Sequence, residues 1–263
     1  MTASHKTPYY KNSAIFNTIG YIMVIAVNVM ASLNILNGKS TAYISEKYGS
    51  LFTPAAITFS IWGLIYFTLL GFIIYQLWLA FSGKHQQELE QFMERLRGWW
   101  LVSCLANTCW LFSWHYELLP LSILIMLTLL VSLLAININF NIALQKVSWP
   151  EKLFIHLPFS LYLGWITIAA VANMAALWLY TGWNGLSISW TIFLILLCTI
   201  AATLLVIIRK NIVVGVVTLW GYSGIILKRQ EAGGPAATPI TIACIVAMVV
   251  IVITALIQLL KKR

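Results

Sequence analysis

Residues 119–143 read LPLSILIMLTLLVSLLAININFNIA, a run without a single Asp, Glu, Lys or Arg. A helix needs about 20 predominantly apolar residues to cross the hydrocarbon core of a bilayer. Backbone polar groups inside lipid must be satisfied within their own segment, so a helix is the expected structure of such a run. This stretch therefore predicts a protein built from membrane-spanning helices.

Seven comparable apolar runs flank it, near residues 15–36, 54–81, 99–116, 153–180, 187–208, 212–227 and 239–260. Of the 263 residues, 61% are hydrophobic and 9% are charged, against about 45–50% and about 25% in soluble domains. We therefore expect an all-α, polytopic transmembrane helix bundle of about eight spans. The run at 212–227 is short and contains three glycines, which lower helix propensity. The longest polar loop, near residues 82–98, is expected to form a short surface helix.

Lysine and arginine are divided unequally between the two sides that eight spans would create. Twelve fall on the side of both termini: Lys6, Lys11, Lys84, Arg95, Arg97, Lys146, Lys152, Arg209, Lys210, Lys261, Lys262 and Arg263. Four fall on the other side: Lys39, Lys47, Lys228 and Arg229. Positive residues favour the cytoplasmic side, so we expect both termini to be cytoplasmic, in a bacterial inner membrane. The net charge of +9 then reflects orientation and predicts no nucleic-acid partner.

The polar residue types argue against several kinds of chemistry. The chain has no Asp, and none of its glutamates lies deep inside a predicted span, which argues against a carboxylate-driven, proton-coupled transporter. The four cysteines form no C-x-x-C pair and no two histidines have helical spacing. We therefore expect no metal site, no catalytic residue and no required cofactor. The first run is longer than the apolar part of a signal peptide and no A-x-A-like site follows it, so we expect it to be retained.

Tryptophan is the most informative residue type, with 12 in the chain. Eight lie near predicted span ends, as in an interfacial belt: Trp78, Trp99, Trp100, Trp114, Trp149, Trp178, Trp183 and Trp190. Trp62, Trp110 and Trp165 lie deeper, where an indole N–H needs a partner. At 1.5 Å per residue, Trp62 and Trp110 are about 12 and about 9 Å from the outer end, and Trp165 is near the midplane.

Polar and aromatic neighbours recur at helical spacing beside these three tryptophans, namely Tyr66, Asn107, Tyr162 and Asn173. Three helices thus offer aromatic faces and amides at overlapping depth. Two interpretations fit this pattern. It is either ordinary packing, with Asn and Trp hydrogen-bonded across helices, or the lining of a shared pocket.

Three segments resemble one known family. Thr53-Pro54-Ala55 followed by Phe59-Ser60-Ile61-Trp62-Gly63-Leu64-Ile65-Tyr66 resembles the proline-led entry into helix two of the tryptophan-rich sensory protein family, which includes the mitochondrial translocator protein, or peripheral benzodiazepine receptor. Asn107-Thr108-Cys109-Trp110 resembles its L-N-x-x-W-S segment in helix three. Residues Tyr162 to Asn173 resemble its Y-L-x-W-V-x-F-A-x-x-L-N segment in helix five.

The resemblance covers residues 15–181 and implies a five-helix bundle there. Residues 1–14 would be a cytoplasmic N-terminal segment, and residues 182–263 a C-terminal extension with three further transmembrane helices. Members of the family bind porphyrins, haem and hydrophobic drug-like molecules, and they often form dimers. By this resemblance Trp62, Asn107 and Trp165 would line a ligand pocket. The loop from Asn37 to Thr53 would cover its mouth, and the residues expected to shape it are Pro54, Tyr66, Trp110, Tyr162 and Asn173.

The sequence departs from the family pattern in three places. Leu161 stands where the family has a proline, and the nearest proline is Pro158, so the bend of that helix is expected to be displaced. Leu111 replaces a serine. Residues 177–185 contain no Lys or Arg, so the family's sterol-recognition pattern is not carried over.

The expected function is that of an integral membrane binding or sensory protein for a hydrophobic aromatic ligand. A tetrapyrrole, porphyrin or haem, is the predicted ligand, and the bilayer and a second copy of the chain are the other expected partners. A transporter or facilitator of small apolar metabolites is the alternative. No enzymatic activity is expected, apart from the Trp-assisted photochemical breakdown of a bound porphyrin that some relatives suggest.

Overall fold

The computed structural model describes residues 7–183 and 187–261, and it is helical throughout. Three residues of the predicted charge division, Lys6, Lys262 and Arg263, lie outside the described residues. The long helices are α1 (Thr7–Ser32), α3 (Ile61–Phe81), α5 (Trp99–His115), α6 (Leu119–Asn139), α8 (Leu157–Tyr180), α9 (Ile188–Ile208), α10 (Ile212–Ala232) and α11 (Ala237–Leu260). The short elements are α2 (Thr41–Lys47), the 3₁₀ helix η1 (Ala56–Ser60), α4 (Gln86–Leu96), α7 (Trp149–Glu151) and the π-helix η2 (Lys152–His156). The all-α prediction is confirmed, since the described residues contain no strand.

Seven of the predicted spans correspond to helical segments that are long and apolar enough to cross a membrane. They end on Ser32, Phe81, Asn139, Tyr180, Ile208, Ala232 and Leu260. The remaining predicted span is α5, whose 17 residues stand at the lower end of the length that crosses the hydrocarbon. The short run predicted at 212–227 is a helix of 21 residues, because α10 continues to Ala232.

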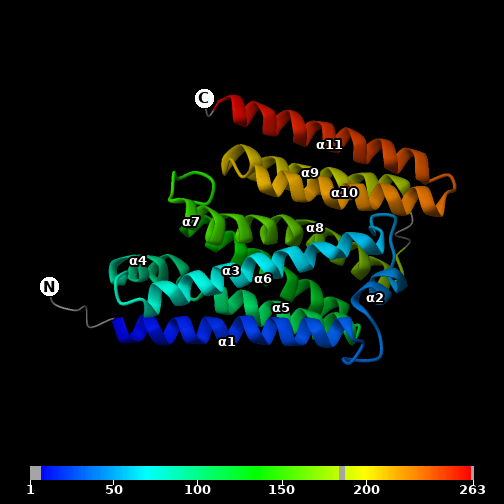
Figure 1. Ribbon diagram of the computed structural model, residues 1–263. Coiled ribbons are helices and arrows are strands. Elements are labelled where there is room, and N and C mark those ends of the chain that lie inside the picture. The colour runs from blue at the N-terminus through cyan, green and yellow to red at the C-terminus, as the bar shows by residue number, and fades with distance from the viewer. Residues whose placement is uncertain (1–6, 184–186, 262–263) are drawn as a thin grey trace.

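The bundle is arranged around α8, the most buried of these segments. Helices α3 and α6 pack on one side of α8, with α1 and α5 beyond them. On the other side α10 packs on α8, and α9 and α11 complete an outer layer (Figure 1). The largest contact between the last three helices and the first five is therefore that of α10 with α8, and α9 with α8 and α10 with η1 make smaller ones.

Glycines make this contact close. A Cβ atom built on Gly221 would lie 2.6 Å from Ile168, and one on Gly164 would lie 2.9 Å from Val217. Small residues let helix backbones approach each other in membranes, where packing replaces the hydrophobic driving force. The glycines of α10 thus lower its helix propensity and at the same time supply its packing surface.

The start of α8 is irregular at the place where the sequence departs from the family. The π-turn η2 ends at His156, directly before α8, and Pro158 occupies the first turn of that helix. Single π-turns and prolines both distort the regular ladder of helical hydrogen bonds. Leu161 lies inside uninterrupted α-helix, so the irregularity lies before Leu161.

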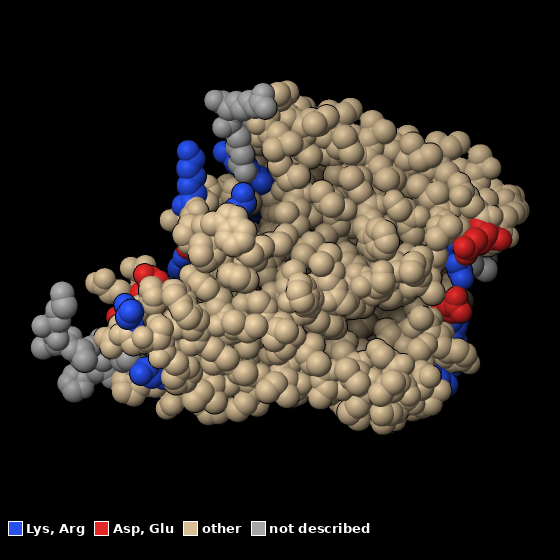
Figure 2. Space-filling view, in the orientation of Figure 1, with Lys and Arg blue, Asp and Glu red and all other residues tan. Residues whose placement is uncertain are grey.

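Charged residues gather at the two ends of the molecule, with a wide uncharged band between them (Figure 2). Helix α1 begins and α11 ends at the same end of the bundle (Figure 1). At that end two arginines cap the C-terminus of α6. Arg95 Nη2 donates to the Phe140 carbonyl at 2.6 Å, and Arg209 Nη2 donates to the Asn137 carbonyl at 2.7 Å. A cation near the last carbonyls of a helix is favourable.

Candidate functional site

The three deep tryptophans meet at the end of the bundle that carries α2. Trp62 comes from α3, Trp110 from α5 and Trp165 from α8. The Trp62 ring centroid lies 6.4 Å from that of Trp110 and 6.1 Å from that of Trp165, the second pair edge to face. Tyr66 stacks on Trp62 at 5.3 Å. Such distances are those of attractive aromatic pairs, so Trp62 is the centre of one aromatic cluster.

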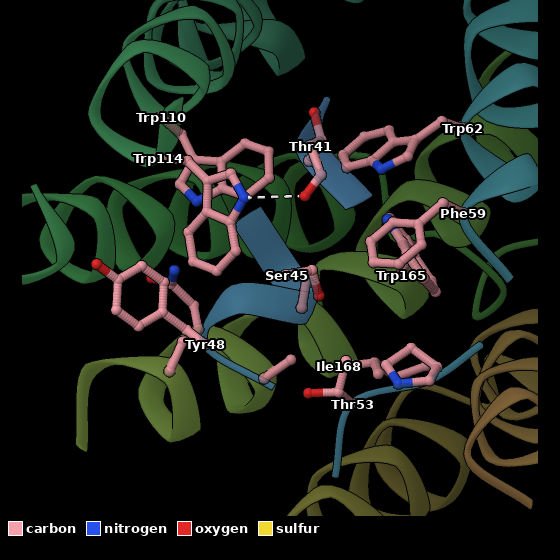
Figure 3. A pocket seen from close by; sticks show the side chains of 15 residues that line it. Thr41, Ser45, Tyr48, Thr53, Phe59, Trp62, Trp110, Trp114, Trp165 and Ile168 are labelled. Carbon is pink, nitrogen blue, oxygen red and sulfur yellow. Dashed lines mark hydrogen bonds between the residues drawn. The ribbon is translucent and has the colours of Figure 1, made fainter. Parts of the chain in front are cut away.

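A small inner pocket lies beside this cluster, between α2, α5 and α8 (Figure 3). Its lining includes five of the residues proposed from the sequence: Pro54, Trp62, Trp110, Trp165 and Asn173. The other lining residues are Thr41, Ser45, Tyr48, Thr53, Phe59, Trp114, Ile168, Ala169, Ala172 and Ala176. Its volume of about 40 Å³ has room for a water molecule or two. Pockets for organic ligands measure about 300–1,000 Å³, so the side chains must move before a large ligand fits.

A second, larger cavity of about 470 Å³ lies on the other side of the same aromatic wall. It is bounded by α1, by the start of α3 and by α2, and Tyr66 is the one further proposed site residue among its lining. Thr41, Phe59, Trp62 and Trp110 line both cavities. Four side chains therefore separate the inner pocket from this lateral cavity.

Two of the proposed site residues, Asn107 and Tyr162, line neither cavity. Asn107 accepts a hydrogen bond from Asn28 at 3.0 Å and donates one to the Tyr162 hydroxyl at 2.8 Å. Asn107 and Tyr162 are 1% and 2% exposed. Their polar atoms are engaged with each other, so they brace α1, α5 and α8 behind the aromatic cluster.

Two polar atoms of the cluster, Trp110 Nε1 and Trp165 Nε1, are buried without a hydrogen-bond partner among the described residues. A buried donor left unsatisfied costs about 1–3 kcal/mol, and such atoms in folded proteins call for an explanation. Both belong to residues that line the inner pocket. The site therefore presents unused hydrogen-bond donors within an aromatic lining.

Trp114 was not among the site residues proposed from the sequence, because it lies near the end of its span. In the structure it is 5% exposed and stacks on Trp110 at 5.7 Å. Its Nε1 donates to the Thr41 carbonyl at 3.3 Å. The four-residue spacing from Trp110 was the signal that places both indoles on one face of α5.

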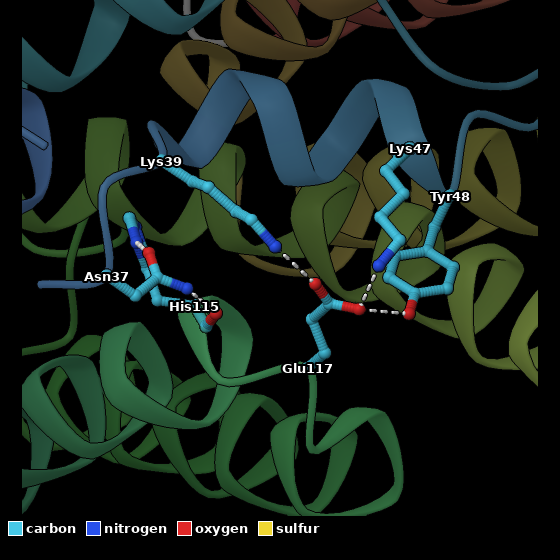
Figure 4. A network of polar contacts seen from close by, with 6 residues as sticks. All are labelled: Asn37, Lys39, Lys47, Tyr48, His115 and Glu117. Carbon is cyan, nitrogen blue, oxygen red and sulfur yellow. Dashed lines mark hydrogen bonds and ion pairs between the residues drawn. The ribbon is translucent and has the colours of Figure 1, made fainter.

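Helix α2 covers the inner pocket, and polar contacts fasten it to the turn between α5 and α6 (Figure 4). Glu117 in that turn accepts from Lys39 at 3.0 Å, from the Tyr48 hydroxyl at 2.6 Å and from Lys47. Hydrogen bonds with Lys47, Tyr48 and Lys39 lower the pKa of Glu117 to about 2. Burial, and then the hydrogen bond to Glu117, raise the pKa of Tyr48 to about 12. We call Lys39, Lys47, Tyr48 and Glu117 the lid latch.

Two further contacts tie the start of α2 and the chain before it to the end of α5. The Asn37 side chain donates to the His115 carbonyl, and the Thr41 hydroxyl is 3.0 Å from His115 Nε2. The inner pocket is thus closed on the side of α2. This helix is anchored by the chain just before it, by its first residue and by its C-terminal end.

The last three helices reach the pocket wall through α10. The Ala55 N–H donates to the Gly224 carbonyl at 2.9 Å, and Trp220 Nε1 donates to the Thr58 carbonyl at 3.0 Å. Ala55 and Thr58 lie where the chain enters α3, next to Pro54, and their partners lie on α10. The position of this segment therefore depends on α10 as well as on the first five helices.

Comparison with known protein families gives a match. The family described as TSPO-like protein matches residues 14–257, which takes in the long helices from α1 to α11. No curated protein and no solved structure matches the chain. Since the match covers most of the sequence and the helices are those of a multi-pass membrane protein, this chain belongs to the TSPO-like protein family and is an integral membrane protein of the binding or transport type.

Proposed function

We propose that this protein binds a flat, conjugated, hydrophobic ligand, a tetrapyrrole such as porphyrin or haem, against Trp62, Trp110 and Trp165. The observation that carries the proposal is that three indoles from three helices meet at a cavity while two of them keep unused N–H donors. Indole faces stack on a conjugated ring. The N–H groups and the Tyr66 hydroxyl can donate to carboxylate or carbonyl oxygens at its edge.

The inner pocket has to enlarge to accept such a ring. Trp62 is the side chain best placed to move. It is only partly buried, and its ring is positioned by packing against aromatic rings such as those of Tyr66 and Tyr162. Displacing it would join the inner pocket to the lateral cavity, and the joined space matches a drug-sized ligand. Binding would then order Trp62 between the ligand and Tyr66.

The test is a titration of the full-length protein with protoporphyrin IX, followed by quenching of tryptophan fluorescence and by porphyrin absorbance. Trp165→Ala and Trp62→Ala should each weaken binding about tenfold or more, the equivalent of about 1.4 kcal/mol. Trp149→Ala is the matched control, since Trp149 is 69% exposed and lines neither cavity. Equal affinity in all four proteins would contradict the proposal.

Asn107→Ala provides a second test of the same site. Asn107 should affect binding indirectly, by holding α1, α5 and α8 in position. It is hydrogen-bonded to Asn28 and Tyr162 and does not line either cavity. We expect a smaller loss of affinity than for Trp165→Ala, accompanied by a loss of thermal stability.

The alternative, a facilitator of small apolar metabolites, is less well supported. Phe72, Trp100 and Phe159 are buried and pack together at ring distances of 4.9–5.9 Å. Phe72 is ten residues beyond Trp62, or about 15 Å along α3, so this packing fills the bundle below the site. A pocket closed at one end favours binding. Porphyrin flux across reconstituted liposomes at the rate of a carrier would reverse this preference.

Catalysis forms no part of the proposed function. A bound porphyrin that is lost under illumination, and lost more slowly in Trp62→Phe and Trp165→Phe proteins, would add a photochemical activity to binding. The same samples kept in the dark provide the control.

A further inference from the structure

The lateral cavity opens between two helices that are long and apolar enough to cross a membrane. Val29 and Ser32 of α1 and Ser60 and Gly63 at the start of α3 line it, and all four are exposed at the surface. Helices α1 and α3 both belong to segments apolar enough to cross a membrane. The surface is hollowed between these helices near α2 (Figure 2). A cavity of about 470 Å³ is therefore open sideways, within the membrane-spanning part of the bundle.

Gly63 stands at the opening. A Cβ atom built on this residue would have no neighbour within 4 Å, unlike one on Gly221 or Gly224. The glycines of α10 allow close packing, whereas the absence of a side chain at Gly63 leaves free space. A bulky side chain there would project into the opening without displacing another group.

The lateral cavity differs from a simple lipid groove in its polar lining. The Tyr66 hydroxyl is buried in it beside the side-chain amides of Asn28 and Asn107, and Asn28 lies in its wall. A lipid chain offers no hydrogen bond to such polar groups. A ligand with an apolar body and a polar edge can offer one as it passes.

The two routes to the inner pocket are unequal. From the aqueous side the ligand would have to release the lid latch, the contacts of Asn37 and Thr41 with His115, and the bond from Trp114 to Thr41. From the lateral cavity it meets the wall of Thr41, Phe59, Trp62 and Trp110. Rotation of a partly buried side chain is far less costly than breaking several hydrogen bonds and ion pairs together.

We propose that the ligand enters from the bilayer, through the lateral cavity between α1 and α3, and that Trp62 is the partition that it displaces to reach the inner pocket. This inference rests on the proposed function and adds the route and the physical class of ligand, a flat apolar molecule already dissolved in the membrane. Gly63 keeps the entrance open, and the lid latch keeps the aqueous side closed.

The first experiment measures protoporphyrin IX association and dissociation with the full chain in lipid nanodiscs, in wild type, Gly63→Phe and Leu64→Phe. Leu64 is the matched control, since it is the next residue of α3, is 51% exposed and lines neither cavity. Gly63→Phe should slow both rates by about tenfold or more, because a blocked entrance slows passage in both directions, whereas Leu64→Phe should keep the wild-type rates. Unchanged rates in Gly63→Phe, or faster dissociation with weaker affinity, would contradict entry through the lateral cavity.

The second experiment needs no ligand. In a Cys109→Ser background, Ile25→Cys places a thiol in the lateral cavity. It should react faster with the membrane-soluble N-phenylmaleimide than with a charged maleimide, and Gly63→Phe should slow the first reaction. Faster reaction with the charged maleimide would contradict access to the lateral cavity from the bilayer. If the wild-type protein fails to bind protoporphyrin IX, the proposed function is contradicted. The labelling result would still decide whether the lateral cavity is open to the bilayer.

Discussion

Gly224 is the residue where α10 meets the entry into α3. A Cβ atom there would lie 1.9 Å from Thr58 Oγ1, and the Gly224 carbonyl accepts from the Ala55 N–H. Gly224→Ala should therefore destabilise the protein by about 1–3 kcal/mol, the usual effect of overpacking. Thermal unfolding in detergent measures this change. Gly63→Ala is the control, since its new Cβ meets open space, and equal stability of the two variants would show that the contact yields without strain.

Glu117 makes the lid latch sensitive to acid. Its pKa is about 2 in the folded protein, below the ordinary value of 4.5. A lowered folded pKa means that the contacts contribute their full stability above about pH 4.5 and lose it as the pH falls toward 2. A nitroxide attached at Tyr43→Cys, which is 53% exposed on α2, should gain mobility in that interval.

Glu117→Gln should make the same nitroxide mobile at neutral pH, with a loss of about 1 kcal/mol for a partly exposed network. The carboxamide keeps the size of the side chain and removes its charge. A nitroxide equally immobile in both proteins at every pH would show that the other anchors of α2 suffice.

Individual site residues were partly predictable. Helical spacing and depth singled out Trp62, Trp110 and Trp165, and these three do meet. Spacing places residues on a face and cannot say which neighbour satisfies them, so it did not reveal that Asn107 is engaged by Asn28 and Tyr162. The belt rule also assigned Trp114 to the interface, because nearness to a span end does not distinguish the inner face of a helix from its outer face.

At the scale of elements, apolar length predicted the long helices and missed α2. This helix has seven residues, far fewer than an isolated helix needs in water. It is stabilised by the Ser40 cap, whose hydroxyl oxygen accepts from the Tyr43 N–H, and by contacts with distant residues such as Glu117. Those contacts exist only once α5 and α6 are in place, so no local pattern encodes them.

The turn between α9 and α10 is held to the first five helices by Asn211. Its Nδ2 donates to Ser160 Oγ at 2.9 Å and to Asn137 Oδ1 at 3.2 Å, all three side chains being buried. Asn211→Ala should cost about 0.6–2 kcal/mol, the range for polar contacts between membrane helices. Unfolding of the variant in detergent tests this, with the exposed Asn12→Ala as control. A loss no greater than in the control would mean that Arg209 alone is sufficient for docking.

At the scale of the whole molecule, the charge pattern and the fold agree on one feature. Helices α1 and α11 have their outer ends at the same end of the bundle (Figure 1), as an even number of spans requires. We expect that end to be cytoplasmic because it carries the larger share of Lys and Arg. Fluorescent-protein fusions at either terminus should then glow in a bacterial host, and periplasmic phosphatase fusions should be inactive. Activity of phosphatase at one terminus alone would require an odd number of crossings.

The sequence predicted the number and class of the long helices and did not predict how the last three pack. Hydropathy records which residues avoid water, and in a bilayer both lipid-facing and helix-facing sides of α10 are apolar. Gly221 and Gly224 face α8 and the entry into α3, and Gly215 faces α9 and α11; in the sequence these glycines predicted only a lowered helix propensity. Their role is seen only in the structure, where Gly221 lies against Ile168 and Gly224 lies against Thr58.

The hydrogen bonds from Ala55 to Gly224 and from Trp220 to Thr58 have a consequence for biogenesis. A nascent chain that has delivered α8 to the translocon already carries every tryptophan of the inner pocket, while the helix that braces the wall beside Pro54 is still unsynthesised. Ribosome-arrested chains ending before residue 212 should insert normally and yet lack the finished binding site, so maturation would be decided by the last helices to leave the ribosome.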